Sequence, residues 1–511
     1  MKIGIIGAGF AGLATAKVLR QAGHDVVVFE KSPDVGGVWS ESRRYPGVTT
    51  QSPRDQYSLS DYPMSRDYPE WPTGAQVQEY LAGYVTHFGL TESLRLNTEV
   101  TSAQPTANGW TLSTRGTVDG ATTTDGATTT DGATTTDGAT TTDDFDRLVV
   151  ANGVFCEPAM PAYPGLPEFT AAGGVLRAAT DFHDVEDARG KNVLVVGYGK
   201  SACDVAVPIS DVAASTSVIA RQLLWKVPRK VGGVLNFKYL LLTRMGEALF
   251  RYRTLRGMEK FLHGPGNRMR RGMLNSVGTA SVRQYQLDKL DILPGGTMEG
   301  IVRGAIGLVT DGFFERVKQG AITVRRDRII VRLLEKDQRP HAELDDGTVL
   351  PADLIVCATG FIQGVPFLEP AQARRLLDER GNFMLYRQIL PVDSPGLYFA
   401  GYNSSFFSPL NAEMAAVWIA AHLAGALTLP EPAAMRQDVV GQLAFMDEAV
   451  DGHHCHGTKI IPFSMHNIDE ILGDLDLNIP ARTRASHWLN PISPRAYREV
   501  TPRLLKRLAG S

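Results

Sequence analysis

The feature that most restricts the fold of this chain is a strand-and-glycine unit that occurs twice. Short apolar runs at residues 2–6 and 192–196 each lead into a glycine turn and then into a helix-like segment. Glycines in such a turn let the backbone approach a pyrophosphate at the N-terminus of the helix, which is typical of a dinucleotide-binding β-α-β unit. The fingerprint positions are Gly7, Gly9 and Gly12 in the first copy and Gly197, Gly199 and Ala202 in the second, where alanine is an allowed last residue.

The length and composition indicate a globular protein of two or three packed units. The 511 residues are 43% hydrophobic and 21% charged, and the 52 basic against 55 acidic residues give no overall basic field that would favour nucleic acid. Four cysteines form no disulfide framework, and the N-terminus is no signal peptide. Residues 415–429 are too short to cross a bilayer and predict a buried helix. We therefore expect a cytoplasmic protein.

Between the two fingerprints lies a low-complexity tract. The hexapeptide DGATTT occurs four times in tandem over residues 119–142 and has no large apolar side chain that could form a core. Because strand-like runs flank the tract, we expect a loop at a hairpin tip without a function of its own. Farther along, residues 321–348 predict a three-stranded meander, and buried strands at 148–153 and 354–360 close the two units.

The residue that follows the second strand of each unit indicates which dinucleotide the unit binds. Glu30 lies 23 residues after Gly7, where a carboxylate binds a ribose 2′-hydroxyl and favours FAD or NAD(H). In the second unit Arg221 follows the strand at 217–220, and a guanidinium there accommodates the 2′-phosphate of NADP(H). The alternatives are an empty glycine turn in the first unit and, in the second, solvated surface cations at Arg221, Lys226, Arg229 and Lys230.

A protein that holds both FAD and NADPH must pass electrons to a further acceptor. A dithiol acceptor would require a redox-active cysteine pair near the flavin, and the four cysteines include no such pair. Oxygen or an organic molecule therefore remains as the acceptor.

Several ordered motifs over residues 1–430 resemble those of the class B flavoprotein monooxygenases, most closely the flavin-containing monooxygenase (FMO) family. GAGFAG with Glu30 resembles the family's FAD fingerprint, and GGVW at residues 36–39 resembles its GGxW. YPGVTTQSP and the following DYPMSRDYPEWPTGAQVQEYL resemble the stretch that the family places over the flavin ring. GYGKSACD resembles the NADPH motif, and ATGF at 358–361 and residues 398–418 resemble later flavin-contacting segments.

The resemblance implies an α/β protein with two Rossmann-like dinucleotide-binding domains, the NADPH domain inserted into a discontinuous FAD domain. We expect the FAD domain at 1–170 and 330–430, the NADPH domain at 171–329 with a helical subdomain at about 225–300, and a C-terminal cap at 431–511. The residues expected to bind FAD or NADPH are Gly7, Ala8, Gly9, Phe10, Ala11, Gly12, Glu30, Lys31, Gly37, Val38, Trp39, Thr50, Gln51, Ser52, Gly197, Gly199, Lys200, Ser201, Ala202, Asp204, Arg221, Thr359 and Gly360.

The chain departs from the family pattern in two places. The linker motif FxGxxxHxxxF/Y aligns with residues 172–182, where Ala172 and Ala178 replace an aromatic residue and the histidine, and His183 is out of register. Phe182 in place of tryptophan argues against the Baeyer-Villiger branch. The family's asparagine beside the flavin aligns with Gln51, whose amide can still donate a hydrogen bond, so Gln51 is the expected catalytic residue. We also expect no membrane-anchoring C-terminal helix of the kind that animal members carry.

The resemblance implies an NADPH-dependent FAD monooxygenase. NADPH would reduce the flavin, O2 would add to the ring as a C4a-hydroperoxide, and an amine nitrogen or sulfide sulfur of a small molecule would take one oxygen atom. Three alternatives stay open: an uncoupled NADPH oxidase or reductase, Baeyer-Villiger oxygenation of a ketone, and a non-enzymatic flavoprotein that binds nucleic acid.

Two residue clusters and one helix carry weaker signals. Residues 221–271 hold 13 Lys or Arg against two Glu, interleaved with apolar side chains. We expect a helical subdomain there and no nucleic acid, while peripheral membrane contact and homo-oligomerisation stay open. The HHCH run at 453–456 lacks the separated ligands of a zinc site, so no metal is expected. A helix from Met465 is expected to cap the substrate channel or to contact another domain.

Overall fold

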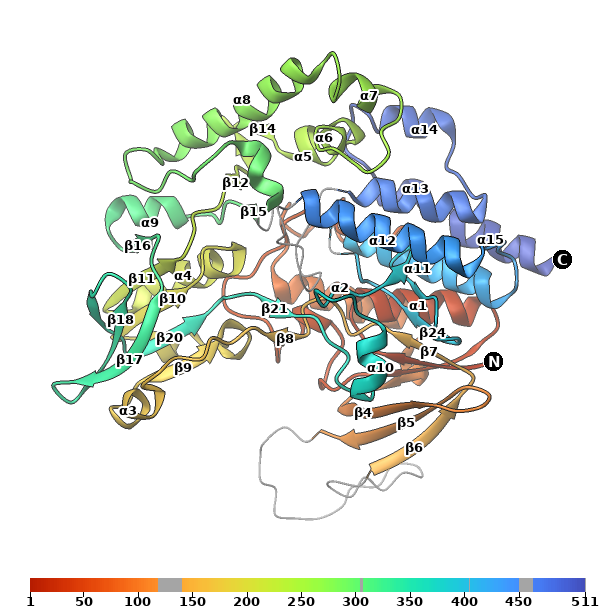
Figure 1. The fold of residues 1–511 in the computed structure, drawn as a ribbon, viewed down its shortest axis with the longest axis horizontal. Coiled ribbons are helices and arrows are strands. Elements are labelled where there is room, and N and C mark those ends of the chain that lie inside the picture. Colours follow the sequence, from red (N-terminus) through yellow and green to blue (C-terminus); the bar gives the residue numbers. More distant parts are fainter. Residues whose placement is uncertain (118–139, 304–306, 404, 450–462, 511) are drawn as a thin grey trace.

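Two parallel β-sheets organise the computed structural model, which describes residues 1–117, 140–303, 307–403, 405–449 and 463–510 (Figure 1). In each sheet a central apolar strand runs into one of the two glycine turns, and a helix leaves the turn. The predicted α/β class with two dinucleotide-binding units is therefore confirmed.

The first sheet has the strand order β24-β7-β1-β2-β3, and all of its neighbouring strands are parallel. Its edge strand β24 follows the second unit in the sequence, so the second unit is inserted into the first. The glycine turn leads into helix α1 (Phe10–Gln21). The strands are β1 (Lys2–Ile6), β2 (Asp25–Phe29), β3 (Leu94–Arg95), β7 (Arg147–Val150) and β24 (Leu397–Phe399).

A helix and an antiparallel sheet complete the N-terminal part of the first unit. Helix α2 (Gly74–His87) begins with a reciprocal capping box between Thr73 and Gln76. The antiparallel sheet pairs β4 (Thr98–Pro105), β5 (Trp110–Gly116) and β6 (Thr140–Phe145). Strand β6 contains the last three residues of the tandem tract, which thus joins two neighbouring antiparallel strands, as the predicted hairpin requires. The rest of the tract lies outside the described residues.

The second sheet has the order β16-β11-β10-β20-β9, again with parallel pairs. Helix α4 (Lys200–Val212) follows its glycine turn, and α9 (Phe313–Gln319) packs beside it. Helix α3 (Leu166–Ala171) packs against the strands at residues 330–344. The strands are β9 (Val175–Ala178), β10 (Asn192–Val196), β11 (Ser215–Ala220), β16 (Thr323–Arg326) and β20 (Leu354–Cys357).

The predicted boundary at residue 330 and the predicted meander need correction. Strand β16, expected to open the meander, instead extends the parallel sheet beside β11. The meander consists of β17 (Ile330–Lys336), β18 (Arg339–Leu344) and β19 (Val349–Pro351), and it leads into β20 of the second sheet. Residues 330–357 therefore belong to the second unit, because their apolar side chains share a core with Leu194 and Ile219.

The predicted helical subdomain consists mainly of α5 (Lys238–Leu241), α6 (Arg244–Ala248), α7 (Met258–Leu262) and α8 (Asn267–Tyr285). A short parallel ladder joins it to the second unit, β12 (Lys226–Val227) with β15 (Gly307–Leu308), and a local hairpin pairs β13 (Lys230–Val231) with β14 (Leu235–Asn236). The basic character that the sequence indicates for residues 221–271 is reduced, because five cations of that range pair with acids outside it. These cations are Arg229, Lys238, Arg244, Arg253 and Arg270.

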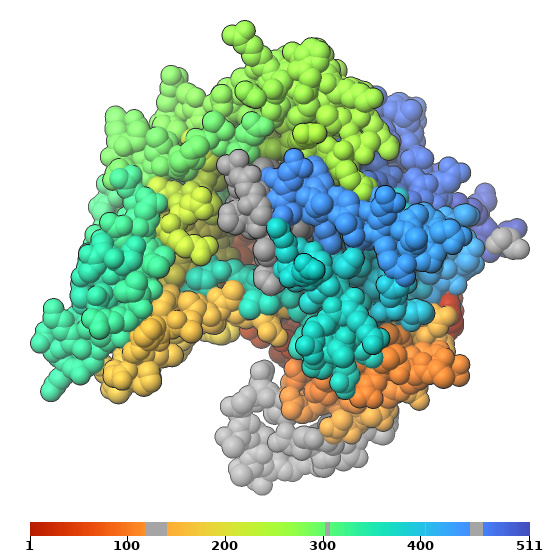
Figure 2. Space-filling model, in the orientation of Figure 1, coloured from red at the N-terminus to blue at the C-terminus, as the bar shows by residue number. Residues whose placement is uncertain are grey.

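The C-terminal helices pack on the first unit. Helix α11 (Ser408–Leu423) confirms a buried helix in this region, but it begins before the predicted range of 415–429 and ends before residues 424–429, which are not helical. It lies between α1 and α13 (Ser464–Leu475). Residues of α12 (Pro432–Ala449), α13 and α15 (Val500–Ala509) share one core with α1, so these three helices are fixed to the first unit. In Figure 2 these blue helices adjoin the green helical subdomain, to which Asp469 of α13 is paired through Arg244.

The remaining described elements are short. None of the helices in the described part of the chain is long and apolar enough to cross a membrane. The short elements are β8 (Glu157–Pro158) paired with β21 (Phe361–Ile362), β22 (Leu385–Tyr386) paired with β23 (Leu390–Pro391), α10 (Pro370–Arg375) and α14 (Ala481–Ser486).

Candidate functional site

The first glycine turn forms a tight cradle at the carboxyl end of β1. Gly7 has φ +107°, and a Cβ at Gly12 would lie 1.8 Å from the carbonyl oxygen of Gly7, so the turn accepts only glycine at position 12. A Cβ on Gly9 would lie 3.6 Å from Cα of Gly37, in the one-turn helix η1 (Gly37–Trp39). Two stretches of backbone without side chains thus face one another, as the approach of a pyrophosphate requires.

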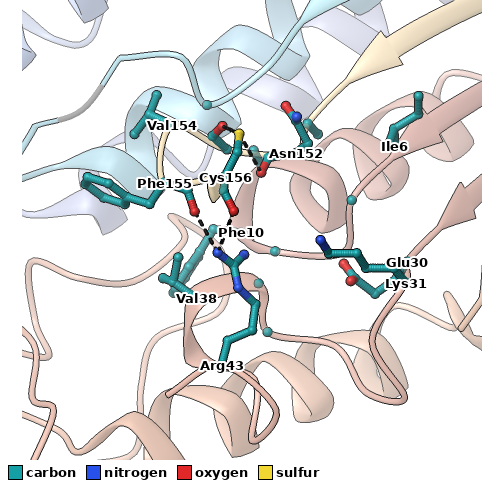
Figure 3. Close-up of a pocket in the computed structure, with 18 of the residues that line it drawn as sticks. Ile6, Phe10, Glu30, Lys31, Val38, Arg43, Asn152, Val154, Phe155 and Cys156 are labelled. Carbon is teal, nitrogen blue, oxygen red and sulfur yellow. Dashed lines mark hydrogen bonds between the residues drawn. The ribbon is translucent and has the colours of Figure 1, made fainter. Parts of the chain in front are cut away.

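The carboxylate of Glu30 is positioned by backbone groups. Its Oε2 accepts a hydrogen bond from the Ala8 N–H at 2.8 Å, and its Oε1 accepts one from the Ser32 N–H at 3.0 Å. Each carboxylate oxygen has a second lone pair, so Glu30 can also accept from ribose hydroxyls. Figure 3 shows Glu30 and Lys31 together at one end of a pocket.

We call this pocket the flavin groove. It runs from Glu30 past the glycine turns to Trp39 and Tyr57. Along its middle Arg43 donates hydrogen bonds to the carbonyl oxygens of Phe155 (2.7 Å) and Cys156 (3.1 Å), as the dashed lines of Figure 3 show. Burial raises the pKa of the Cys156 thiol, which keeps the thiol neutral. An elongated groove with a ribose acceptor at one end fits FAD.

A second pocket, the interdomain cleft, continues from the flavin groove. Val38, Trp39, Arg43, Tyr57, Phe155 and Ser408 line both. The opposite wall of the cleft carries Gly199, Lys200 and Ser201 of the second fingerprint, together with Gly360. The two fingerprints therefore face one continuous space.

The start of helix α4 is joined to the first unit by side chains. The Tyr45 hydroxyl donates to Oγ of Ser201 at 2.8 Å. Lys200 forms a buried ion pair with Asp204, whose carboxylate also accepts from Thr310. Burial lowers the pKa of Lys200, and the carboxylate of Asp204 opposes that shift. Because Asp204 is buried and does not line the cleft, it positions Lys200 and is not placed to touch a ligand there.

Gln51 lies in the wall of the interdomain cleft. Its Oε1 accepts a hydrogen bond from the Leu308 N–H at 3.2 Å, which leaves the amide nitrogen to donate. Ser52, beside it, donates to the carbonyl oxygen of Phe406 at 2.8 Å. Thr50 is buried behind this wall and lines neither pocket. Of the three, only Gln51 and Ser52 are thus presented to the cleft.

The cations that follow β11 differ in their surroundings. Arg221 is exposed, its side chain has no hydrogen-bond or ion-pair partner in the described part of the chain, and it lines neither pocket. Lys226 is buried and donates to the carbonyl oxygen of Tyr198 at 2.7 Å. Arg229 contacts Asp311 and Thr49. The interpretation as solvated surface cations is therefore wrong for Lys226 and Arg229.

The structure brings most of the sequence-predicted residues to this continuous space. Those that line the flavin groove or the cleft are Gly7, Gly9, Phe10, Ala11, Glu30, Lys31, Gly37, Val38, Trp39, Gln51, Ser52, Gly199, Lys200, Ser201 and Gly360. Those that line neither are Ala8, Gly12, Thr50, Gly197, Ala202, Asp204, Arg221 and Thr359.

Sequence reasoning missed several lining residues, among them Arg43, Tyr45, Tyr57 and Phe155. Phe155 lies shortly after β7, and ligands bind at the carboxyl ends of parallel strands. The predicted strand at 148–153 could therefore have indicated that Phe155 lines the site. The other three lie in a loop after η1, where no periodicity marks them.

The altered positions of the linker motif, Ala172 and Ala178, line neither pocket, whereas Ala179 and Thr180 of the same segment line the interdomain cleft. Ala178 ends β9 and is buried, as is Phe182. His183 is exposed, with Nδ1 3.3 Å from the carbonyl oxygen of Arg44. The HHCH run lies outside the described residues, so the expectation of no metal there stays a prediction. Within the described residues no cluster of three His, Cys, Asp or Glu is placed to hold a metal ion.

Two dinucleotide sites that open into one space define a protein that passes electrons between two cofactors. The family of flavin-binding monooxygenase-like proteins matches residues 1–263, more than half of the chain. The chain belongs to this family.

Curated relatives and solved structures agree with that family. The probable indole-3-pyruvate monooxygenase YUCCA9 of Arabidopsis thaliana is 28% identical over 71% of this chain and 75% of its own. Human flavin-containing monooxygenase 3 is 24% identical over 86% of this chain and 76% of its own. The NADP+-bound cyclohexanone monooxygenase from Rhodococcus superposes with a TM-score of 0.64 at 18% identity, covering 92% of this chain and 96% of that one. This last likeness shows the shared fold.

Membership of the family confirms several predictions. The protein is an oxidoreductase, a flavoprotein monooxygenase that uses FAD and NADPH. A monooxygenase acts on a small-molecule substrate and O2. The alternative of a non-enzymatic flavoprotein that binds nucleic acid is wrong, since the chain belongs to a family of enzymes.

Proposed function

We propose that this enzyme uses NADPH and O2 to oxygenate a soft nucleophile, an amine nitrogen or a sulfide sulfur, of a small molecule. The observation that carries the proposal is the continuity of the flavin groove with the interdomain cleft, where Trp39, Arg43 and Tyr57 line both. A hydride donor held at Ser201 and a flavin held at Glu30 would share that space. Among solved structures of the same fold, one neighbour is an S-allyl-L-cysteine S-oxygenase from Allium sativum.

The proposed reaction needs no acid-base triad, and its atoms and electrons balance as follows. Bound FAD supplies the redox chemistry, since it accepts two electrons from NADPH and passes them to O2. One oxygen atom forms a bond to the substrate's sulfur or nitrogen, and the other leaves as water with the two electrons and two protons. The products are a sulfoxide or an amine oxide, water and NADP+.

The residues of the chain bind and orient the two cofactors. Glu30 accepts hydrogen bonds from the adenosine ribose of FAD, and the cradle of Gly7, Gly9 and Gly12 receives the pyrophosphate. Gly199, Lys200 and Ser201 receive the pyrophosphate of NADPH at the start of α4, and Arg221 pairs with its 2′-phosphate.

Gln51 and the apolar wall around it protect the oxygenation step. The Gln51 amide nitrogen donates a hydrogen bond to oxygen in the cleft, while Leu308 holds the amide oxygen. Trp39, Tyr57 and Phe155 exclude water from the space beside it. Burial raises the pKa of Tyr57 to about 12, so this phenol stays protonated and adds no charge to the wall.

The test is the stoichiometry of turnover with methyl phenyl sulfide, a tertiary amine and cyclohexanone as substrates. We expect nearly one sulfoxide or amine oxide per NADPH consumed, little hydrogen peroxide and no lactone. Peroxide equal to NADPH with every substrate would overturn the proposal in favour of an NADPH oxidase. Lactone as the main product would favour the Baeyer-Villiger alternative.

A pair of variants at Gln51 tests its role separately. Gln51→Leu removes the donor, and we expect the peroxide fraction of the NADPH consumed to rise strongly. Gln51→Asn restores the amide of the wider family, and we expect coupling close to that of the parent enzyme. Equal coupling in all three proteins would show that Gln51 is not the catalytic residue.

A further inference from the structure

A third cavity lies within the helical subdomain, and its wall is mostly apolar. Side chains from β12, the β13–β14 ladder, α5 and α8 form most of its wall. The sequence assigned no role to this space. Characteristic wall residues are Val227, Leu235, Leu241, Phe250, Leu274 and Val277.

Three polar residues, Glu247, Ser276 and Ser464, line this cavity, and the first two are already hydrogen-bonded. The carboxylate of Glu247 accepts from the backbone N–H groups of Met465 and His466 and lies 2.6 Å from Nδ1 of His466. Oγ of Ser276 donates to the carbonyl oxygen of Met273 at 2.7 Å. A hydrocarbon group can therefore enter the cavity without leaving these polar atoms unpaired.

On its inner side the cavity is separated from the interdomain cleft by one aromatic residue. Phe406 lines both spaces. Its carbonyl oxygen is held by Ser52, next to Gln51, so the partition stands beside the proposed oxygenation position. A molecule that occupied the cavity and extended past the Phe406 ring would reach the cleft.

On its outer side the cavity meets solvent at apolar residues. Leu235 and Met273 line the cavity and are 45% and 37% exposed. Val234, Tyr239 and Met269, on the same part of the subdomain, are also exposed. The mouth therefore favours the entry of an apolar molecule from solution.

We propose that this cavity binds the hydrocarbon part of the substrate, so that the enzyme acts on sulfides or amines that carry a long alkyl chain. The alkyl chain of the substrate occupies the space between α5 and α8, and its sulfur or nitrogen atom reaches past Phe406 into the interdomain cleft. This substrate class rests on the proposed function, but the binding of a hydrocarbon chain in the cavity does not.

The size of the effect follows from apolar burial. Each methylene removed from water contributes up to about 0.8 kcal/mol, so each added methylene raises kcat/KM up to about fourfold until the cavity is filled. A shallow surface site would give no such rise of kcat/KM with the length of the alkyl chain.

The test compares n-alkyl methyl sulfides from ethyl to dodecyl as substrates of the FAD-loaded enzyme. We expect kcat/KM to rise with chain length and then to reach a plateau. Val277→Trp places an indole in the space that the alkyl chain would fill, and losing the burial of only two methylenes already corresponds to at least about a tenfold loss of kcat/KM for the dodecyl substrate. The ethyl substrate changes less than about twofold, because it is too short to reach the cavity.

Control variants test whether an added indole outside the cavity changes the kinetics in the same way. Val440→Trp adds the same side chain at an exposed position of α12, away from the cavity, and should leave the chain-length profile unchanged. If Val277→Trp does not fold, Met273→Trp at the exposed mouth replaces it. Its control is Asn275→Trp, at an exposed position of α8 that does not line the cavity. Calorimetric titration of dodecyl methyl sulfide into the oxidised holoenzyme measures binding without turnover.

The outcomes separate the two proposals. Oxygenation of all sulfides with a flat chain-length profile would overturn the cavity proposal and leave the proposed function intact. Binding of the dodecyl sulfide that Val277→Trp abolishes, without any oxygenation, would overturn the proposed function and support the cavity. Equal binding by the parent and Val277→Trp proteins would overturn the cavity proposal whatever the activity.

Discussion

The two glycine turns of this protein share a backbone path and differ in what surrounds it. Gly7 and Gly197 both have positive φ, +107° and +123°, and both turns lead into the start of a helix. In the first turn a Cβ at position 12 would collide with backbone, whereas the second turn accommodates Ala202 at the equivalent position. The glycine fingerprint therefore determines the backbone path in both units, but the two turns differ in whether they accommodate a side chain at the last fingerprint position.

The charged residues Glu30 and Arg221, which follow the second strand of each unit, differ more in their surroundings than the two glycine turns do. Glu30 is buried and bound by two backbone N–H groups, so its carboxylate is oriented before any ligand arrives. Arg221 is exposed and has no side-chain partner among the residues that the structure describes. Removal of the first group should therefore disturb both ligand and loop, while removal of the second should affect the ligand alone.

The largest expected effect tests the difference in tolerance between the turns. Gly12→Ala introduces a Cβ 1.8 Å from the Gly7 carbonyl oxygen, an overlap that only a shift of the backbone can relieve. We expect the purified variant to retain almost no flavin, measured as flavin absorbance per protein. Gly272→Ala on α8, where nothing lies within 4 Å, is the control and should keep its full flavin content. A flavin-replete Gly12→Ala protein would contradict the described turn.

A smaller effect is expected at the first charged residue. Glu30→Gln removes charge-assisted hydrogen bonds worth 1.5–3 kcal/mol, so the Kd for FAD should rise about 10- to 100-fold. The Kd is measured from the quenching of FAD fluorescence when FAD is added to the apoprotein. Glu99→Gln, in the same groove but paired with Arg115, serves as the control with an unchanged Kd. Equal Kd values for the two variants would remove Glu30 from the ribose site.

A still smaller effect is expected at the second charged residue, because it is exposed. Arg221→Ala should lower kcat/KM for NADPH about tenfold at low ionic strength and leave kcat/KM for NADH unchanged. The difference should shrink as salt is added, since an exposed pair is screened. Arg283→Ala on α8 controls for the loss of one surface charge. If the preference for NADPH survives in Arg221→Ala, another residue binds the 2′-phosphate.

The smallest effect is expected where the second turn tolerates a side chain. Ala202→Gly removes only a methyl group near the start of α4 and should lower the free energy of unfolding by no more than about 1 kcal/mol. The KM for NADPH should not change. Chemical denaturation and steady-state kinetics measure the two quantities. A large rise in KM would show that the second turn is as demanding as the first.

The sequence predicted the parts of the site that local chemistry dictates. A strand, a glycine turn and a helix follow from residues that are neighbours in the chain, so both fingerprints and Glu30 were recognisable, whereas the insertion of one unit into the other was implied by the resemblance to the FMO family. The sequence misplaced residues 321–357, because a short apolar strand such as β16 fits a meander and a parallel sheet equally well. Its pairing partner, β11, is about a hundred residues away.

The sequence by itself indicated two dinucleotide-binding units and their cofactors, since glycine turns and the charges beyond them act through local geometry, and its ordered motifs indicated the class of enzyme through their resemblance to the FMO family. Only the tertiary structure decided that the two turns face one continuous space, that Arg43, Tyr57 and Phe155 line it, and that Phe406 divides it from an apolar cavity. The physical reason is that a cavity wall is assembled from segments distant in the chain. Its shape therefore depends on how the helices and sheets pack, which no local pattern of residues encodes.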